Sequence, residues 1–140
     1  MKRNVFGALM ALIVASSIAV PVVQAQQTIL TANVPFAFNV GDKQLPAAAY
    51  AVREMGRATL IQSKDCKESA LGIYNYAGPS KADETKLVFK RVGDHYFLAQ
   101  IWTSVRGQGL AVPQSKLEKE MRGSNSGPQG GVETVIVALR

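Results

Sequence analysis

The chain has 140 residues and a formal net charge of +6, from 16 Lys+Arg against 10 Asp+Glu. Its basic residues are scattered, and because no run of five or six like charges occurs, a nucleic-acid partner is not expected. With one His and one Cys, the chain lacks the ligands of the usual nitrogen and sulfur metal sites and cannot form an internal disulfide. No metal or other cofactor is therefore predicted, and stability must come from burial of apolar side chains.

The N-terminal segment has the layout of a secretory signal. Two basic residues at positions 2 and 3 precede an apolar run from Val5 to Val23, and Val23 and Ala25 supply the small residues at positions −3 and −1 of a cut after Ala25. This pattern predicts a signal peptide over residues 1–25, cleaved after Ala25, and export to the periplasm or out of the cell. The run is close to the roughly 20 residues that span a bilayer. The alternative is therefore an uncleaved N-terminal anchor. A membrane contact is expected only in that case, through the uncleaved N-terminus.

Period-two alternation of apolar residues dominates the rest of the chain. Residues Val34 to Val40 predict a strand, which should lie or start at a sheet edge because Pro35 has no N–H to donate. Further strands are predicted around Tyr50–Arg53, over Ala58–Ser63 and over Ser69–Tyr76, with a polar turn at residues 64–67 and a loop at residues 78–83.

The clearest local signal is a hairpin. Lys86–Val92 and His95–Thr103 are predicted as strands joined by the two-residue turn Gly93-Asp94, whose first position suits Gly. The second of these strands is apolar on both faces, which predicts a central or covered position.

The C-terminal part changes character. Ser115 and Glu118 fit a capping box and predict a short helix over residues 115–122 with Leu117 and Met121 on one face. Residues 26–122 are thus predicted as a β domain that includes this helix. Residues 123–131 have the composition of a flexible linker. Residues 132–140 are rich in β-branched side chains and predict a last strand that pairs with the same domain.

Six or seven short strands predict an all-β fold, either a small antiparallel sandwich or a barrel. Removal of residues 1–25 would leave one domain with 14 Lys+Arg against 10 Asp+Glu, a net charge of +4.

Two segments carry a resemblance. Val34-Pro35-Phe36-Ala37-Phe38-Asn39-Val40-Gly41 and Leu45-Pro46-Ala47-Ala48-Ala49-Tyr50 resemble the V-P-F-x-F-x-V-G and L-P-A-G-x-Y segments of small exported bacterial proteins of unassigned function. The resemblance covers most of residues 32–120 and implies export and a β fold, but no activity. The chain departs from the pattern at Ala48, where Gly is usual, and at Cys66, where a turn Gly is expected. Either residue would carry backbone strain if its φ were positive.

Four aromatic residues are the candidate binding residues: Tyr74, Tyr76, Tyr96 and Trp102. Aromatic rings exposed on a sheet can stack on sugars or bind a protein partner. Packing of the same rings in the core is the alternative.

No catalytic constellation is evident. His95 stands alone, and its neighbour Asp94 cannot orient it, because adjacent side chains of a strand point to opposite faces. No spacing brings two carboxylates together, and no Ser lies in a G-x-S-x-G motif. Cys66 is expected to be a half-buried turn residue.

The sequence therefore predicts an exported, non-enzymatic binding or structural module of the envelope or the extracellular space. An envelope protein, a glycan or an apolar small molecule are the partners considered. One alternative is a barrel that carries an apolar ligand in an interior lined by Phe36, Phe38, Phe89 and Phe97. The other is an envelope hydrolase that uses His95 and a nearby carboxylate.

Overall fold

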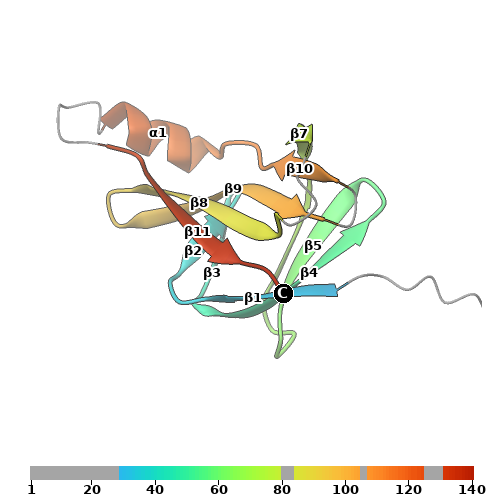
Figure 1. The fold of residues 1–140 in the computed structure, drawn as a ribbon. Helices are drawn as coiled ribbons and strands as arrows, with labels where there is room; N and C mark the ends of the chain where they lie inside the picture. The colour runs from blue at the N-terminus through green and yellow to red at the C-terminus, as the bar shows by residue number, and fades with distance from the viewer. Residues whose placement is uncertain (1–28, 80–83, 105–106, 125–130) are drawn as a thin grey trace, which may run out of the picture.

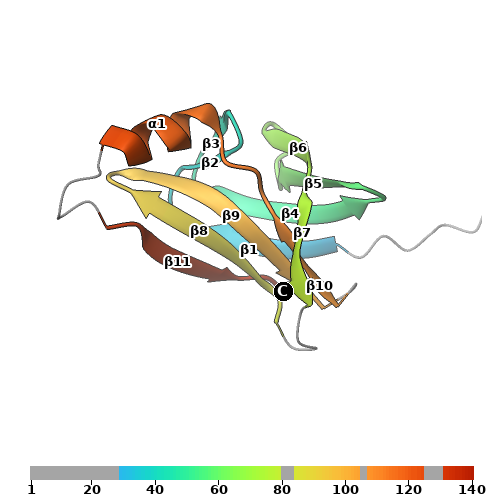
Figure 2. The same cartoon turned by 90° about the horizontal axis from the view of Figure 1, so that it is seen from above.

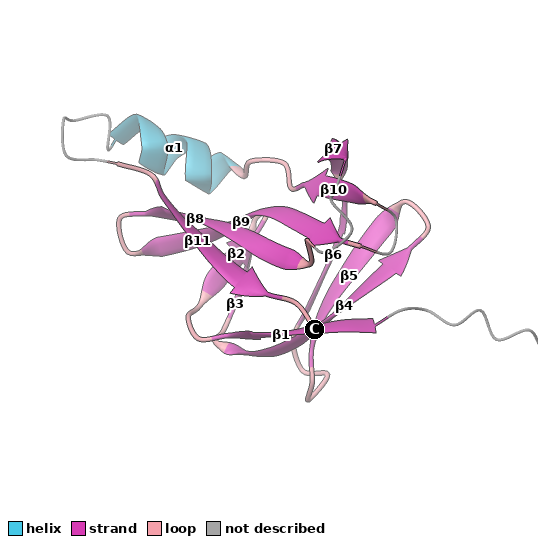
Figure 3. Cartoon of the chain, viewed as in Figure 1, coloured by secondary structure: helices cyan, strands magenta, loops and turns pink. Residues whose placement is uncertain are grey.

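The computed structural model describes residues 29–79, 84–104, 107–124 and 131–140. These residues form eleven strands and one helix, so the predicted all-β class is confirmed (Figure 3). The strands make two sheets that face each other as a sandwich and do not close into a barrel. Several of the eleven strands have only three to five residues, which is why period-two patterns indicated fewer.

The first sheet has four antiparallel strands in the order β1 (Ile29–Val34), β4 (Ala48–Met55), β5 (Ala58–Ser63) and β6 (Ser69–Ile73). The second has seven strands. Five follow the order β11 (Glu133–Ala138), β8 (Lys86–Val92), β9 (His95–Thr103), β10 (Gln108–Ala111) and β7 (Asn75–Pro79). The remaining two are β2 (Phe38–Val40), which pairs in parallel with β9, and β3 (Lys43–Leu45), which pairs with β2.

The core lies between the two sheets, where aromatic rings meet edge to face. Phe38 lies 5.2 Å from both Tyr50 and Phe89, measured between ring centroids. Tyr50 is fully buried, and its hydroxyl donates a hydrogen bond to the carbonyl oxygen of Pro46 at 2.5 Å. These rings fix the distance between the sheets because each buries a large apolar area at a defined angle.

The chain crosses from one sheet to the other at two places where one strand was predicted. The strand predicted from Val34 to Val40 is in fact two, because β1 ends at Val34 in the four-stranded sheet and β2 begins at Phe38 in the seven-stranded sheet. Pro35 cannot donate to the ladder and marks the break. The strand predicted over Ser69–Tyr76 likewise divides into β6 and β7 on either side of Tyr74.

The predicted β8–β9 hairpin is confirmed residue for residue. Gly93, in the turn, has φ +61°, a conformation that costs glycine nothing. β9 is central as predicted, with β8 on one side and β10 on the other. A bulge interrupts the β8–β9 ladder, since Val88 lies opposite Gln100 but the next residue, Phe89, lies opposite Leu98. The extra residue of β9 reverses the faces of the side chains beyond it.

Helix α1 (Lys116–Ser124) follows the predicted cap, with the Glu118 N–H donating to Ser115 Oγ at 3.1 Å. It packs against β8 on the outer side of the seven-stranded sheet, as Figure 1 and Figure 2 show. Of the two residues predicted to share one face, Leu117 is exposed and Met121 is half-buried, whereas Glu118 is buried. The helix also continues through Gly123, which had been expected to end it.

The last strand pairs as predicted. β11 is antiparallel to β8 along its whole length and forms one edge of the seven-stranded sheet. Beyond it, Arg140 and Thr31 exchange two main-chain hydrogen bonds of 2.7 and 2.9 Å, which tie this edge to β1 of the other sheet. The predicted signal peptide with Ala25, and positions 125–130 of the predicted linker, lie outside the described residues.

Cys66 is exposed rather than half-buried as expected. Its φ is +59°, and it is the one residue other than glycine with a positive φ in the described part of the chain. Of the two positions where glycine was expected, Cys66 therefore carries the backbone strain of a positive φ, and Ala48 does not. The turn around it is held by Asp65, whose Oδ1 accepts hydrogen bonds from Ser63 Oγ and the Lys67 N–H. These bonds lower the pKa of the Asp65 carboxyl.

Candidate functional site

A groove of about 520 Å³ opens between the ends of the two sheets, and two of the predicted aromatic residues line it. It lies where the chain leaves β6 and enters β7, so each sheet supplies one wall. We call it the tyrosine groove. Its polar and aromatic lining residues include Glu54, Arg57, Tyr74, Asn75, Tyr76 and Gln108, and Ile73 and Leu110 add apolar surface.

Tyr74 stands at the crossover between the sheets. Its ring covers Gly72, where an added Cβ would lie 2.6 Å from Tyr74 Cε1, so only glycine allows this packing. The hydroxyl oxygen is buried and has no hydrogen-bond partner among the described residues. Burial raises the pKa of Tyr74 to about 12, because the tyrosinate would lose its hydration. Tyr74 is therefore a structural wall of the groove.

Tyr76 is the accessible ring of the groove, with 63% of its surface exposed. It lies on β7 opposite Leu110 of β10, and Leu110 lies opposite the buried Ile101 of β9. Because residues paired across strands share a face, Tyr76 lies on the inner side of its sheet, at the open end of the sandwich. A flat ring in this position offers a stacking surface to a ligand.

Charged and amide groups surround the ring. Arg57 comes from the β4–β5 turn, where Gly56 has φ +64° and shapes the tip. Glu54 reaches in from β4, and its Oε1 accepts a hydrogen bond of 2.8 Å from Thr103 Oγ1, a buried hydroxyl of β9. This bond links the two sheets at the floor of the groove and holds the carboxylate in a fixed position. Gln108 and Asn75 add amide donors and acceptors.

The other two predicted aromatic residues do not join the groove. Tyr96 lies opposite Arg91, and Trp102 lies opposite Lys86. The first pair is on the core side of the sheet and the second on its outer side, because the bulge between them reverses the faces. The four residues therefore do not form one patch, and only Tyr74 and Tyr76 are brought together.

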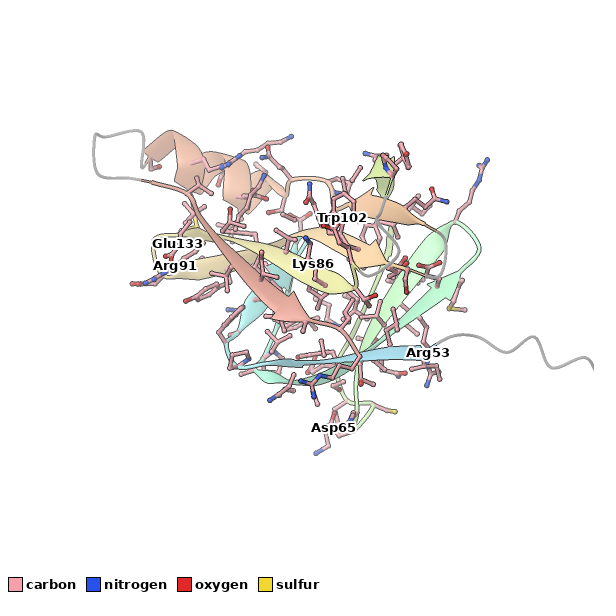
Figure 4. The ribbon with its side chains drawn as sticks, in the orientation of Figure 1. Arg53, Asp65, Lys86, Arg91, Trp102 and Glu133 are labelled. Carbon is pink, nitrogen blue, oxygen red and sulfur yellow. The ribbon has the colours of Figure 1, made fainter. Side chains whose placement is uncertain are left out.

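Trp102 lies flat on two glycines. An added Cβ on Gly109 would lie 2.7 Å from the indole ring, and one on Gly78 would lie 4.0 Å from it. The indole Nε1 donates to Gln100 Oε1 at 3.1 Å, and Lys86 Nζ lies 5.8 Å from the ring centroid (Figure 4). The ring is thus committed to packing within its own sheet.

Tyr96 is committed to the core. Its ring stacks on Phe36 with 4.0 Å between centroids, and the Arg91 guanidinium lies 5.7 Å from it. Arg91 also pairs with Glu133 of β11 at 3.3 Å, and Figure 4 shows these two side chains side by side. The cluster fastens the last strand to the hairpin.

The residues considered for chemistry are apart from the groove. His95 is exposed at the start of β9, and Thr103 at the other end of that strand contacts the groove floor. The ring contact of His95 is Phe97, at 6.4 Å between centroids. Within the described residues, no three His, Cys, Asp or Glu side chains lie close enough to hold a metal ion.

The phenylalanines considered for a carrier fill the sandwich instead of lining a void. Phe36 and Phe89 meet edge to face at 5.2 Å, and Phe38 meets Phe89 at the same distance. Phe97 lies opposite Lys90, on the outer side of the seven-stranded sheet, and is buried there outside the main core.

Comparisons with models of known protein families, with curated proteins and with solved structures found no match. In the part of the chain that the structure describes, no helix is long and apolar enough to span a membrane. Sequence reasoning missed Glu54 and Asn75, and it missed Arg57 and Gln108. The sequence signals for Arg57 and Gln108 were the glycines that precede them, Gly56 and Gly107, which the structure places in turns with positive φ.

Proposed function

We propose that the protein is an exported, non-enzymatic binding module of the envelope or extracellular space, and that the tyrosine groove binds a glycan. The observation that carries this proposal is the exposed Tyr76 ring in a groove whose lining includes a guanidinium, a carboxylate and two amides. Export rests on the predicted signal peptide over residues 1–25 and on the resemblance to exported bacterial proteins.

The chemistry of the groove matches that of a sugar. The face of a pyranose ring presents C–H groups that stack on an aromatic ring, while its hydroxyl groups need donors and acceptors at the edge. Tyr76 offers the ring, and Asn75 and Gln108 offer both donors and acceptors. Glu54 lines the floor of the groove in a fixed position, because its carboxylate accepts the hydrogen bond from Thr103.

The alternatives have less support. A hydrolase needs a carboxylate within hydrogen-bond reach of His95. His95 is exposed at the start of β9, whereas Glu54 is bonded to Thr103 at the other end of that strand. An apolar carrier needs interior space, and Phe36, Phe38 and Phe89 occupy the interior by contacting one another.

Titration of the ¹⁵N-labelled protein with soluble peptidoglycan fragments and with N-acetylglucosamine oligomers tests the proposal. The amide signals of Asn75, Tyr76 and Gln108 should shift, and Tyr76→Ala should weaken binding about tenfold, the loss of one aromatic stacking contact. Ile136→Ala is the matched control, because Ile136 is 60% exposed on β11, at the opposite edge of the same sheet.

Two results would count against a glycan groove. One is the absence of shifts in the groove with any of these sugars at millimolar concentration. The other is equal weakening by Tyr76→Ala and Ile136→Ala, which would show that the loss does not depend on the groove.

A further inference from the structure

The outer face of the four-stranded sheet is apolar at one end, and no described element covers it. Cross-strand pairing places Ile29, Arg53, Leu60 and Leu71 in one row, and Met55, Ala58 and Ile73 in the next. Of the eight large apolar side chains that are exposed in the described chain, four lie in these two rows, at 48 to 72% exposure: Ile29, Met55, Leu71 and Ile73. We call these two rows the apolar face.

The contrast with the other sheet is direct. On the seven-stranded sheet, α1 packs on the outer side, and Val92 and Phe97 are buried there. Figure 1 shows α1 beyond β8 and β9, with β1, β4 and β5 on the far side of the sandwich and no helix over them. An exposed apolar patch of this kind marks a contact surface.

A single charge occupies the middle of the apolar face. Arg53 lies between Ile29 and Leu60 in the first row, and Figure 4 shows it beside β1, away from the acidic Glu133. Its guanidinium makes no hydrogen bond or ion pair with any described residue, and its Nε is buried without a partner. Arg57 adds a second cation at the tip of the β4–β5 turn.

Among the described residues of β1, β4, β5 and β6, no acidic side chain balances these cations on the same face. The outward positions of β1, β4, β5 and β6 carry Thr, Asn, Ala, Gln and Ser besides the apolar rows, and the carboxylate of Glu54 points inward to Thr103. A second copy of the chain is a poor occupant, because two such faces packed together would bring Arg53 near Arg53 of the other copy. A partner that covers the apolar face must therefore combine an apolar layer with negative charges.

We propose that the apolar face docks on an anionic lipid surface. Apolar side chains enter the boundary between headgroups and acyl chains, and arginine reaches the lipid phosphates from the same level. The net charge of +4 for residues 26–140 adds a general attraction to such a surface. This contact is separate from the predicted N-terminal anchor. It shares Ile73 and Arg57 with the border of the tyrosine groove but does not include Tyr76.

Sedimentation with large vesicles tests the proposal. The protein used is residues 26–140, which contain every strand and every core residue that the structure describes and lack the apolar N-terminal run. Vesicles of phosphatidylethanolamine with one quarter phosphatidylglycerol are compared with phosphatidylcholine vesicles. Binding should favour the anionic vesicles and fall as salt rises.

Two variants locate the contact. Leu71→Ser combined with Ile73→Ser should lower the partition coefficient about tenfold or more, through the apolar area lost from the lipid. Arg53→Gln should lower it about fivefold, the effect of one cation at an anionic surface. The matched controls are Ile136→Ser, at a similarly exposed strand position, and Lys116→Gln, whose side chain is 87% exposed on α1.

Circular dichroism and thermal melting establish that each variant is folded. The proposal is overturned if the parent protein does not sediment with anionic vesicles, or binds phosphatidylcholine equally well. It is also overturned if the controls lose as much binding as the face variants. Because Tyr76→Ala leaves this face intact, loss of sugar binding in that variant with vesicle binding retained separates the two proposals.

Discussion

Replacing Tyr74 by Phe removes one hydroxyl group from the wall of the tyrosine groove and should stabilise the protein. The Tyr74 oxygen is buried and has no hydrogen-bond partner among the described residues. A buried hydroxyl without a partner costs about 1 to 3 kcal/mol of desolvation. Because solvent reaches part of the ring, we expect Tyr74→Phe to raise the free energy of unfolding by about 1 kcal/mol at neutral pH.

Alkaline pH should enlarge this difference. The pKa of Tyr74 is raised from 10.0 to about 12 in the folded protein, so both states are protonated below pH 10 and the shift has no effect there. Between pH 10 and pH 12 the unfolded chain releases the proton and the folded chain keeps it, so stability falls as pH rises. Two pKa units correspond to about 2.7 kcal/mol, which partial exposure reduces to about 2 kcal/mol.

Urea unfolding, followed by the fluorescence of the single Trp102 from pH 7 to pH 12, measures both effects. Tyr50→Phe is the control, since its hydroxyl donates to the Pro46 carbonyl at 2.5 Å and its loss should cost about 1 kcal/mol at neutral pH. A Tyr74→Phe protein less stable than the parent would show that the hydroxyl has a partner. Parallel stability curves above pH 10 would refute the raised pKa.

Two further substitutions test the backbone. Cys66→Gly should stabilise the protein by about 0.5 to 1 kcal/mol. Relief of a left-handed φ is worth about 1 to 2 kcal/mol, and the greater flexibility of the unfolded chain offsets about 0.4 to 1 kcal/mol of this gain. Cys66→Ala keeps the strain and should not be more stable, so equal melting temperatures for the two variants would contradict this explanation. Gly109→Ala should lower the free energy of unfolding by about 1 to 3 kcal/mol and change Trp102 fluorescence, because its Cβ would meet the indole ring at 2.7 Å. Gly123→Ala is the control, because a Cβ there meets nothing within 4 Å. An unchanged emission spectrum in Gly109→Ala would refute the contact.

The elements that sequence reasoning predicted well are those whose signal is local. β5, β8 and β9 have the predicted bounds, because alternation within each strand and the Gly93-Asp94 turn depend on neighbouring residues alone. The helix was found through its Ser115 cap for the same reason. Period-two alternation, however, continues unchanged when a chain bends from one sheet into the other. Pro35 therefore indicated an edge or a strand start but not a change of sheet, and the crossover at Tyr74 gave no signal of its own.

The candidate site was predicted in half. Tyr74 and Tyr76 lie together because they follow one another across the β6–β7 crossover, whereas Tyr96 and Trp102 are separated by a bulge that pairing alone reveals. Arg57 and Gln108 belong to a turn and to β10, an element that no apolar pattern indicated. The exposure of the apolar face could not be predicted from the sequence either, because Leu71 and Ile73 are residue types that usually lie in the core.

The parallel pairing of β2 with β9, at Asn39 and Phe97, has a kinetic consequence. These two residues are 58 positions apart, and β11 must in turn reach back to β8 across the helix. Contacts between distant segments slow folding, because the intervening loop loses conformational entropy before the contact contributes stabilising free energy. A newly made chain should therefore remain open for longer than a helical protein of its size, and an open chain is the form that a narrow translocation channel can thread.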